Sequence, residues 1–365
     1  MTSMRITFVI SHADLSGGMR VITTYAQRLA ERGHQVTVVS RPKRSPTFRE
    51  WFHHRFLGKP LPWAARPVSK SHLDGLANVR HHLIDRHRAI VADDLPDGDV
   101  VLATWWETME WIWPMPPSKG AKVHFMQDYE TFGGDKPRVD ATCRLPVRRI
   151  VIAQWVKDLL EKEFANPPTA LIPNAVDQTL FHAPPRGKQA IPTVGTVYTR
   201  FRNKGTDIAL EAFRLAKRRM PALKLLVFGG GDVDPSLPLP PEAEFFQRLP
   251  DEKLRDVYSR CDAWLFATRI EAFGLPVLEA MACRTPVIAT PAGAAPELLA
   301  GGGGVLVPHE NPAAMADAIV DLLQIPDANW RRYSDAAFAT AGQYTWEKMV
   351  DQFENVLNEA ARDFG

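Results

Sequence analysis

The sequence predicts an α/β protein made of two domains, each built on a parallel β-sheet. Short apolar segments typical of buried strands alternate along the chain with amphipathic segments typical of helices. A polar stretch that contains proline and glycine, residues 184–192, interrupts this alternation, which then starts again. With 365 residues, the chain is long enough for two or three domains.

The first half opens with a β-α-β unit. A buried strand is expected at residues 6–10, an amphipathic helix at 19–32 and a second strand at 35–40. Ligands of open parallel sheets bind beyond the carboxyl ends of the strands, so the Ser/Gly loop at residues 11–18 should face a site. Further strands are expected at 99–103, 122–126, 150–153 and 170–172.

The second half shows the same alternation without repeating the sequence. It predicts strands at residues 193–197, 224–228, 263–267, 287–290 and 305–307. Helices are expected at residues 207–220, 252–260, 276–283, 312–323 and 346–362. The predicted organisation is a domain at 1–183, a hinge at 184–192, a second domain at 193–342 and a C-terminal helix at 343–365 that could pack back on the first domain.

Composition argues against several classes of protein. Every apolar run is far shorter than the roughly 20 residues that span a bilayer, and the N-terminus lacks the apolar core of a signal peptide. The three cysteines are widely spaced and form no C-x-x-C pair, which predicts neither disulfides nor a thiolate zinc site. A net charge of +2 argues against a dedicated nucleic-acid binder. We therefore expect a cytoplasmic protein that binds no nucleic acid.

Positive charge is concentrated in residues 41–88. This segment contains eleven lysines and arginines against three acidic residues, and its aromatic residues include Trp51, Phe52, Phe56 and Trp63. A basic residue close to an anionic lipid surface contributes about 1 kcal/mol to binding. The segment is therefore expected to dock peripherally on the inner face of the membrane, with a solvated basic insertion as the alternative.

The most specific segment of the chain is residues 268–282. It carries two glutamates, Glu271 and Glu279, on either side of a Phe-Gly-Leu-Pro turn that leads from a strand end into a helix. Backbone amides at such a helix start donate to anions or hydroxyls, and carboxylates accept hydrogen bonds from sugar hydroxyls. The segment therefore predicts a site for a nucleotide sugar.

In these residues the chain resembles the E-x7-E retaining glycosyltransferases of the GT-B fold, the large group 1 or family 4 type that includes bacterial mannosyl-, glucosyl- and rhamnosyltransferases. The resemblance covers nearly the whole chain and implies two Rossmann-like domains that face each other across a cleft, the first binding the acceptor and the second the nucleotide sugar. It implies that Glu271 contacts the donor sugar and that Glu279 binds the ribose. It also implies that backbone amides between them hold sugar hydroxyls or phosphate, at Ala272, Phe273, Gly274 and Leu275.

A basic loop at residues 198–205 is the second sequence feature that indicates a site for a nucleotide sugar. Two cations beside a helix start would neutralise a diphosphate and stabilise the charge that it gains as the glycosidic bond breaks. Arg200 and Lys204 match the arginine and the Lys-Gly pair of the resembling family, which bind the donor diphosphate. Because Arg202 lies between them, the choice of arginine stays open.

The resemblance implies three further contacts with the donor. Gly17 and Gly18 match a glycine pair that lets the backbone of the first domain approach the donor phosphates. Gly230 lies in a glycine turn that the family places beside the nucleotide. Leu249 precedes a helix at a position where the loop backbone of the family often contacts the base.

The chain also departs from the family pattern. The family often has a histidine at the end of a strand in the first domain, where this chain has Gln127 and Asp128. We take Asp128 as the candidate catalytic residue and leave open whether Gln127 has the role instead. His124, inside the predicted strand, is expected to be a core residue with satisfied hydrogen bonds. Arg284 replaces a glycine that usually follows the second glutamate's helix, a change expected to alter the local backbone.

No metal and no cofactor are expected. The chain has no HExxH motif, Cys/His cluster or P-loop, and its two D-x-D patterns, at 97–99 and 232–234, are expected to lie in loops. The first loop lacks G-x-G-x-x-G and the second strand ends at Ser40 without a ribose-binding acid, which argues against NAD. Arg41 follows this strand, and an arginine there can bind the 2′-phosphate of NADP, so an NADP oxidoreductase stays a weak alternative.

The sequence therefore predicts a retaining glycosyltransferase. It would move a sugar from a nucleoside-diphosphate donor to a hydroxyl of a glycan or lipid-linked acceptor, in cell-surface polysaccharide or glycolipid biosynthesis. The alternatives are a nucleotide-sugar epimerase and a non-catalytic relative that binds nucleotide sugars or glycans.

Overall fold

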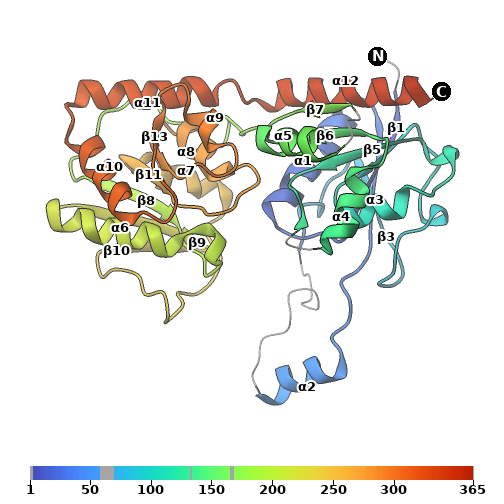
Figure 1. Ribbon diagram of the computed structural model, residues 1–365, viewed down its shortest axis with the longest axis horizontal. Helices are drawn as coiled ribbons and strands as arrows, with labels where there is room; N and C mark the ends of the chain where they lie inside the picture. The colour runs from blue at the N-terminus through green and yellow to red at the C-terminus, as the bar shows by residue number, and fades with distance from the viewer. Residues whose placement is uncertain (1–2, 58–69, 132–133, 165–167, 365) are drawn as a thin grey trace. The chain divides into compact units, whose positions relative to one another are not determined.

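The computed structural model describes residues 3–57, 70–131, 134–164 and 168–364. The chain divides into two compact units (Figure 1). The first comprises the residues up to Ile172 together with those from Val350 onward, and the second comprises Pro173–Met349. The stretch 184–192 lies within the second unit, where Arg186 donates to the carbonyl of Cys261 and the backbone of Gln189 donates to Asp262.

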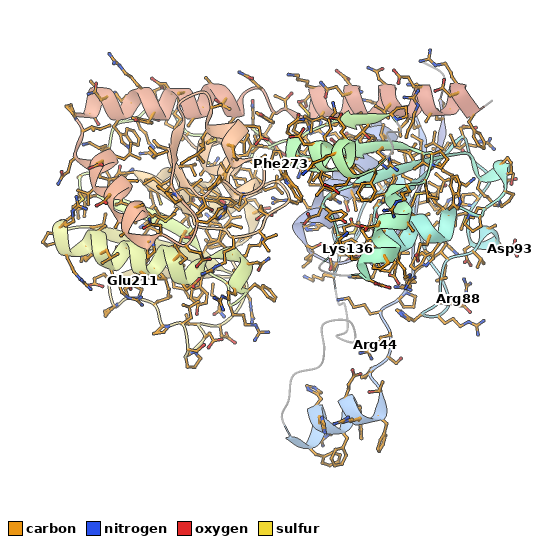
Figure 2. The ribbon with its side chains drawn as sticks, in the orientation of Figure 1. Arg44, Arg88, Asp93, Lys136, Glu211 and Phe273 are labelled. Atoms are coloured by element: carbon orange, nitrogen blue, oxygen red, sulfur yellow. The ribbon has the colours of Figure 1, made fainter. Side chains whose placement is uncertain are left out.

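The first unit contains a seven-stranded parallel sheet in the order β3-β2-β1-β4-β5-β6-β7. Its strands are β1 (Arg5–Ile10), β2 (Gln35–Ser40), β3 (Val79–Leu83), β4 (Val100–Ala103), β5 (Ala121–Met126), β6 (Arg148–Val151) and β7 (Thr169–Leu171). Its helices are α1 (Gly17–Glu31), α2 (Phe48–Leu57), α3 (Trp106–Ile112), α4 (Lys136–Cys143) and α5 (Gln154–Glu163). Lys136, the first residue of α4, is labelled in Figure 2.

The second unit contains a six-stranded parallel sheet in the order β10-β9-β8-β11-β12-β13. Its strands are β8 (Thr193–Val197), β9 (Lys224–Gly229), β10 (Ala243–Gln247), β11 (Ala263–Phe266), β12 (Val287–Ala289) and β13 (Gly304–Leu306). Its helices are α6 (Thr206–Arg219), α7 (Asp251–Ser259), α8 (Leu275–Ala282), α9 (Ala295–Leu299), α10 (Pro312–Gln324) and α11 (Asp327–Ala341), with a short 3-10 turn, η5 (Arg202–Lys204). The predicted two-domain α/β architecture is therefore confirmed.

Both sheets change winding direction at one point. In each sheet the first strand in sequence, β1 or β8, lies between the second and the fourth strands. The loops that follow β1 and β4, or β8 and β11, therefore leave the same edge of the sheet from adjacent strands. Such topological switch points are where ligands bind in open α/β sheets.

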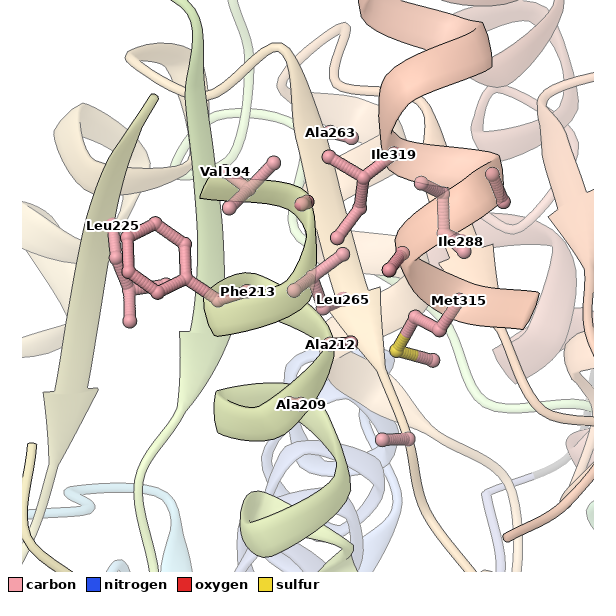
Figure 3. Close-up of a cluster of buried hydrophobic side chains, with 14 of the residues drawn as sticks. Val194, Ala209, Ala212, Phe213, Leu225, Ala263, Leu265, Ile288, Met315 and Ile319 are labelled. Atoms are coloured by element: carbon pink, nitrogen blue, oxygen red, sulfur yellow. The ribbon is translucent and has the colours of Figure 1, made fainter. Parts of the chain in front are cut away.

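The core of the second unit explains why its strands are so apolar. Aliphatic and aromatic side chains from β8, β9, β11 and β12 pack against those of α6 and α10, as Figure 3 shows for Phe213, Leu265 and Ile319. All three are almost fully buried. Gly195, within β8, leaves space for the indole of Trp264, because a Cβ there would lie 2.4 Å from that ring.

The last helix, α12 (Trp346–Phe364), contributes residues to both units. Its Phe353 is fully buried in the first unit, with ring centroids 4.2 Å from Tyr25 and 5.2 Å from Phe125. The next residue, Glu354, accepts from Arg32 at 2.7 Å. The final part of α12 is therefore built into the core of the first unit.

No helix among the described residues is long and apolar enough to cross a membrane.

Candidate functional site

Two loops meet at the carboxyl edge of the second unit's sheet. One follows β8 and the other follows β11, and the switch point makes these strands neighbours. Lys204 on the first loop lies with its Nζ 2.6 Å from the Oε2 of Glu271 on the second. The two side chains are 39% and 15% exposed. The structure thus brings together the predicted cation and the predicted sugar-binding carboxylate.

Gly205 makes this close approach possible. Its φ of +65° places the residue in the left-handed region. A Cβ there would lie 1.9 Å from the carbonyl oxygen of Ala267, at the end of β11. The glycine of the Lys-Gly pair is therefore required by the packing of one loop on the other.

Helix α8 begins four residues after Glu271, at the end of a glycine-dependent turn. Gly274 caps the helix with a φ of +101°. Among the predicted donors, the amide of Ala272 donates to Glu271 itself at 3.3 Å. Phe273, labelled in Figure 2, is buried and its carbonyl accepts from Ala294 at 2.8 Å. Leu275 is the first residue of the helix.

Glu279 lies in the middle of α8 and is only 4% exposed. It accepts a hydrogen bond from the Tyr258 hydroxyl at 2.8 Å. The Tyr258 ring packs edge-on against Trp264, with centroids 4.5 Å apart. Sequence reasoning missed Tyr258, which fixes the carboxylate that is predicted to bind the ribose.

Gly230 and Leu249 lie on neighbouring loops because β9 and β10 are paired. Arg248, with a φ of +52°, donates from its backbone to Gly229 at 2.8 Å and from Nε to the Gly230 carbonyl at 3.2 Å. Gly230 is exposed and Leu249 is half-buried. These two predicted contacts are therefore on adjacent turns at the same edge of the sheet.

Arg200 is exposed and borders a hollow of about 200 Å³ beside the start of α6. Phe201, Arg202 and Asp234 also border this hollow. Both candidate arginines thus face the same space, and the choice between them stays open.

The predicted residues of the first unit lie at the start of α1 and after β5. Gly17 is the first residue of α1, and the carbonyl of Gly18 accepts from the Gln127 side chain at 3.1 Å. Asp128 is half-buried and accepts from the backbone of Tyr129 at 2.7 Å. Gln127 therefore contacts the glycine pair.

A Ser-His-Asp cluster that sequence reasoning missed follows β1. The Nδ1 of His12 lies 3.1 Å from the Ser11 hydroxyl, and its Nε2 lies 3.4 Å from the Asp14 carboxylate. Burial acts to raise the pKa of Asp14, but hydrogen bonds from His12 and Ser16 outweigh it and lower that pKa. The closely spaced polar residues 11, 12 and 14 after a buried strand were the available signal.

His124 is a core residue, as predicted, but its hydrogen bonds are not satisfied. The side chain is fully buried in β5, and neither ring nitrogen has a hydrogen-bond partner among the described residues. Burial, with a smaller contribution from Arg149, lowers the pKa of His124 to about 3. The imidazole is therefore neutral at physiological pH.

The two D-x-D patterns have structural partners. Asp97 pairs with Lys119 and Asp99 pairs with Arg5. In the second pattern, Asp234 accepts from the backbone of Ser236. In the described part of the chain, no group of three His, Cys, Asp or Glu side chains is arranged to hold a metal ion.

Comparison with known proteins identifies relatives of both the sequence and the fold. Residues 188–325 match the family model of the glycosyl transferases group 1. A D-inositol 3-phosphate glycosyltransferase from Segniliparus rotundus is 32% identical over 160 residues, which cover 40% of this chain and 35% of that protein. The chain thus spans about a third of the length of this curated relative.

Two solved structures resemble nearly the whole chain. Sucrose-phosphate synthase from Thermosynechococcus elongatus has a TM-score of 0.71 at 20% identity, covering 97% of this chain and 98% of that one. Alr3699/HepE from Anabaena, in complex with UDP and glucose, has a TM-score of 0.71 at 16% identity, covering 98% and 100%. The two-sheet architecture is thus the GT-B fold.

Proposed function

We propose, from the GT-B fold and the match of residues 188–325 to the group 1 glycosyl transferases, that this protein is a retaining glycosyltransferase. The donor is a nucleoside-diphosphate sugar and the acceptor is a hydroxyl of a glycan or a lipid-linked sugar. The reaction belongs to the synthesis of cell-surface polysaccharide or glycolipid. The observation that carries the proposal is the contact between Lys204 and Glu271.

This contact provides the two kinds of group that the reaction needs. The glycosidic bond breaks as the diphosphate leaves, and the leaving oxygen gains negative charge. Lys204 and one of the two arginines, Arg200 or Arg202, stabilise that charge, while Glu271 accepts hydrogen bonds from the sugar hydroxyls. Glu279 and the loops at Gly230 and Leu249 hold the nucleoside, and the proton of the acceptor hydroxyl passes to the departing phosphate.

The free protein holds Lys204 and Glu271 as an ion pair. Binding of a diphosphate sugar would replace this ion pair with contacts to the ligand. Lys204 would then contact the phosphate, and Glu271 would contact the sugar hydroxyls. Both side chains are only partly exposed, so the exchange occurs without fully solvating either charge. The ion pair thus keeps both groups in place before the donor arrives.

The test is transfer from radiolabelled UDP-glucose and GDP-mannose, with and without a membrane extract as the source of acceptor. We expect transfer that depends on acceptor, with retained anomeric configuration in the product by NMR. Lys204→Ala and Glu271→Gln should each lower the rate by about 10²–10³ while the fold survives. Lys224→Ala and Glu211→Gln are the matched controls, because these residues lie at the amino end of β9 and on the exposed side of α6.

Other results would point to the alternatives. Turnover of the donor without acceptor would indicate an epimerase, and donor binding without turnover would indicate a non-catalytic relative. Near-normal transfer by Lys204→Ala or Glu271→Gln would reject the assigned role of that residue.

We further propose that the basic segment 41–88 docks at the cytoplasmic face of an anionic membrane, where a lipid-linked acceptor is found. Helix α2 presents Phe48, Trp51, Phe52 and Phe56, whose rings contact one another and are 42–79% exposed. Arg49 and Arg55 are exposed on the same helix. Trp63 lies outside the described residues.

Vesicle binding tests this docking. We expect binding to vesicles that contain phosphatidylglycerol, weakened by salt, and little binding to phosphatidylcholine alone. Replacing Trp51 and Phe56 with alanine should weaken it, whereas replacing the exposed Trp113 should not. Equal binding to both kinds of vesicle would reject an electrostatic contribution.

A further inference from the structure

Arg269 lies in the loop after β11, two residues before Glu271, and its side chain is only 15% exposed. Its Nη1 donates to the carbonyl of Arg202 at 2.6 Å and to Asp207 Oδ1 at 2.8 Å. Its Nη2 donates to Asp207 Oδ2 at 2.8 Å and to Glu310 Oε2 at 3.0 Å, and its Nε donates to Glu310 Oε1. A guanidinium has five N–H donors, so every one of them is used by the protein.

The backbone beside Arg269 holds the same turn. The amide of Arg269 donates to the carbonyl of Asn203 at 2.8 Å, and the amide of Ile270 donates to that carbonyl at 3.3 Å. Asn203 is the middle residue of η5, the turn that ends at Lys204. The turn is therefore fixed to the loop after β11 by its backbone and by the Arg269 side chain.

Two ion pairs join the two loops, and each loop supplies the cation of one pair and the carboxylate of the other. The loop after β8 carries Lys204 and continues to Asp207 in the first turn of α6, and the loop after β11 carries Arg269 and Glu271. Lys204 pairs with Glu271 through a single contact at 2.6 Å, whereas Arg269 holds Asp207 with two parallel hydrogen bonds. Bidentate pairs are geometrically specific, so the Arg269 pair can hold the loops in register when a ligand opens the other pair.

We propose that Arg269 is a positioning residue, which sets the place of Lys204 toward the donor diphosphate by fixing the turn on which Lys204 stands. This inference rests on the proposed function. Because all its donors are engaged, Arg269 acts through the turn and not by contact with the ligand. Arg269→Ala should therefore lower transfer only by displacing Lys204.

Steady-state kinetics with the donor that the wild type uses test whether Arg269 contributes to the rate of transfer. Arg269→Ala should lower kcat roughly tenfold or more, with a smaller effect on KM, because Lys204 acts mainly on charge that develops during bond breaking. Arg269→Lys should recover part of the rate, since an ammonium can still pair with Asp207. The matched control is Arg260→Ala, which breaks an exposed 2.8 Å pair with Glu244 in the same unit. Wild-type kcat in Arg269→Ala would overturn the proposal.

A double-variant cycle tests whether the effect passes through Lys204. In the Lys204→Ala background, adding Arg269→Ala should change kcat less than about twofold, because no lysine remains to be positioned. A purely structural role would lower the rate by the same factor in both backgrounds. That result would overturn the proposal.

Hydrogen exchange separates this inference from the proposed function. The amides of Lys204 and Gly205 donate to Phe201 and Arg202 within the turn, and their exchange should accelerate in Arg269→Ala but not in Arg260→Ala. If Arg269→Ala does not fold, Asp207→Asn replaces it in this experiment. Asparagine keeps the shape of the side chain but removes the charge that pairs with Arg269, so the same acceleration is expected. If the wild type transfers no sugar, the proposed function fails, and unchanged exchange would independently overturn the positioning role.

Discussion

At the scale of single residues, Arg284 combines a departure from the family pattern with a backbone conformation that is rare outside glycine. The residue stands where the resembling family usually has glycine, and its φ of +59° is the left-handed conformation that glycine adopts readily. The expected change of backbone shape stays a prediction. Its side chain donates to the carbonyl of Ala183 at 3.1 Å, and its guanidinium lies 4.1 Å from the centroid of the Phe338 ring.

The buried imidazole of His124 predicts a pH dependence of stability. Its pKa falls from 6.5 to about 3 on folding. Between these values the unfolded chain binds a proton that the folded chain does not, so stability falls as the pH falls below 6.5. The slope is about 1.4 kcal/mol per pH unit for a single group within this window.

The variant His124→Leu removes this dependence. We expect it to be at least as stable as the wild type at pH 7.5, because both ring nitrogens lack partners. At pH 5 the wild type should have lost roughly 2 kcal/mol more than the variant. The free energy of unfolding of both proteins can be measured against pH by hydrogen exchange of the β5 amides in increasing urea. If it changes with pH in the same way for the wild type and the variant, the prediction is contradicted.

At the scale of elements, strands with an apolar sequence could be predicted, including the edge strands β7 and β13, and two more polar edge strands could not. Every predicted strand is present, with ends shifted by at most two residues. The missed strands are β3 and β10, which lie at the edges of their sheets and are largely exposed or half-buried. Their polar residues break the apolar run that identifies a buried parallel strand.

The candidate site was predictable where a motif lies on one segment. The Glu271 and Glu279 pair and the Lys-Gly pair are visible in the sequence because each is local. Arg269 and Tyr258 were missed because their partners are 62 and 21 residues away. Only the pairing of β8 with β11, which folding creates, brings Arg269 to Asp207.

Gly205 provides a prediction for the turn that carries Lys204. Gly205→Ala should lower the stability of the second unit by more than about 2 kcal/mol. Alanine would have to adopt the left-handed backbone conformation, and its Cβ would overlap the carbonyl oxygen of Ala267. The substitution should also weaken binding of the proposed nucleotide-sugar donor, because it displaces Lys204. Thermal unfolding and calorimetry measure both effects. Gly231→Ala is the control, because a Cβ there meets nothing within 4 Å, and equal behaviour of the two variants would contradict the prediction.

At the scale of the whole molecule, the first unit depends on the end of the chain. The Phe353 ring packs against the rings of Tyr25 and Phe125, which also contact each other, and its centroid lies 6.3 Å from that of Phe8. Phe353→Ala should therefore lower the free energy of unfolding of this unit by about 3–5 kcal/mol. Hydrogen exchange in β1 and β5 measures the loss, and the exposed Asn355 on the same helix, replaced by alanine, should have little effect.

The return of α12 to the first unit sets an order of events during synthesis. The ribosome completes the segment 173–349 before it makes Phe353, and at roughly 5–20 residues per second this takes about 9–35 s. Throughout that time the nascent N-terminal sheet has an apolar surface without its covering helix. The later-made unit can thus reach its native state first, and the earlier-made one cannot complete its core until α12 is synthesised.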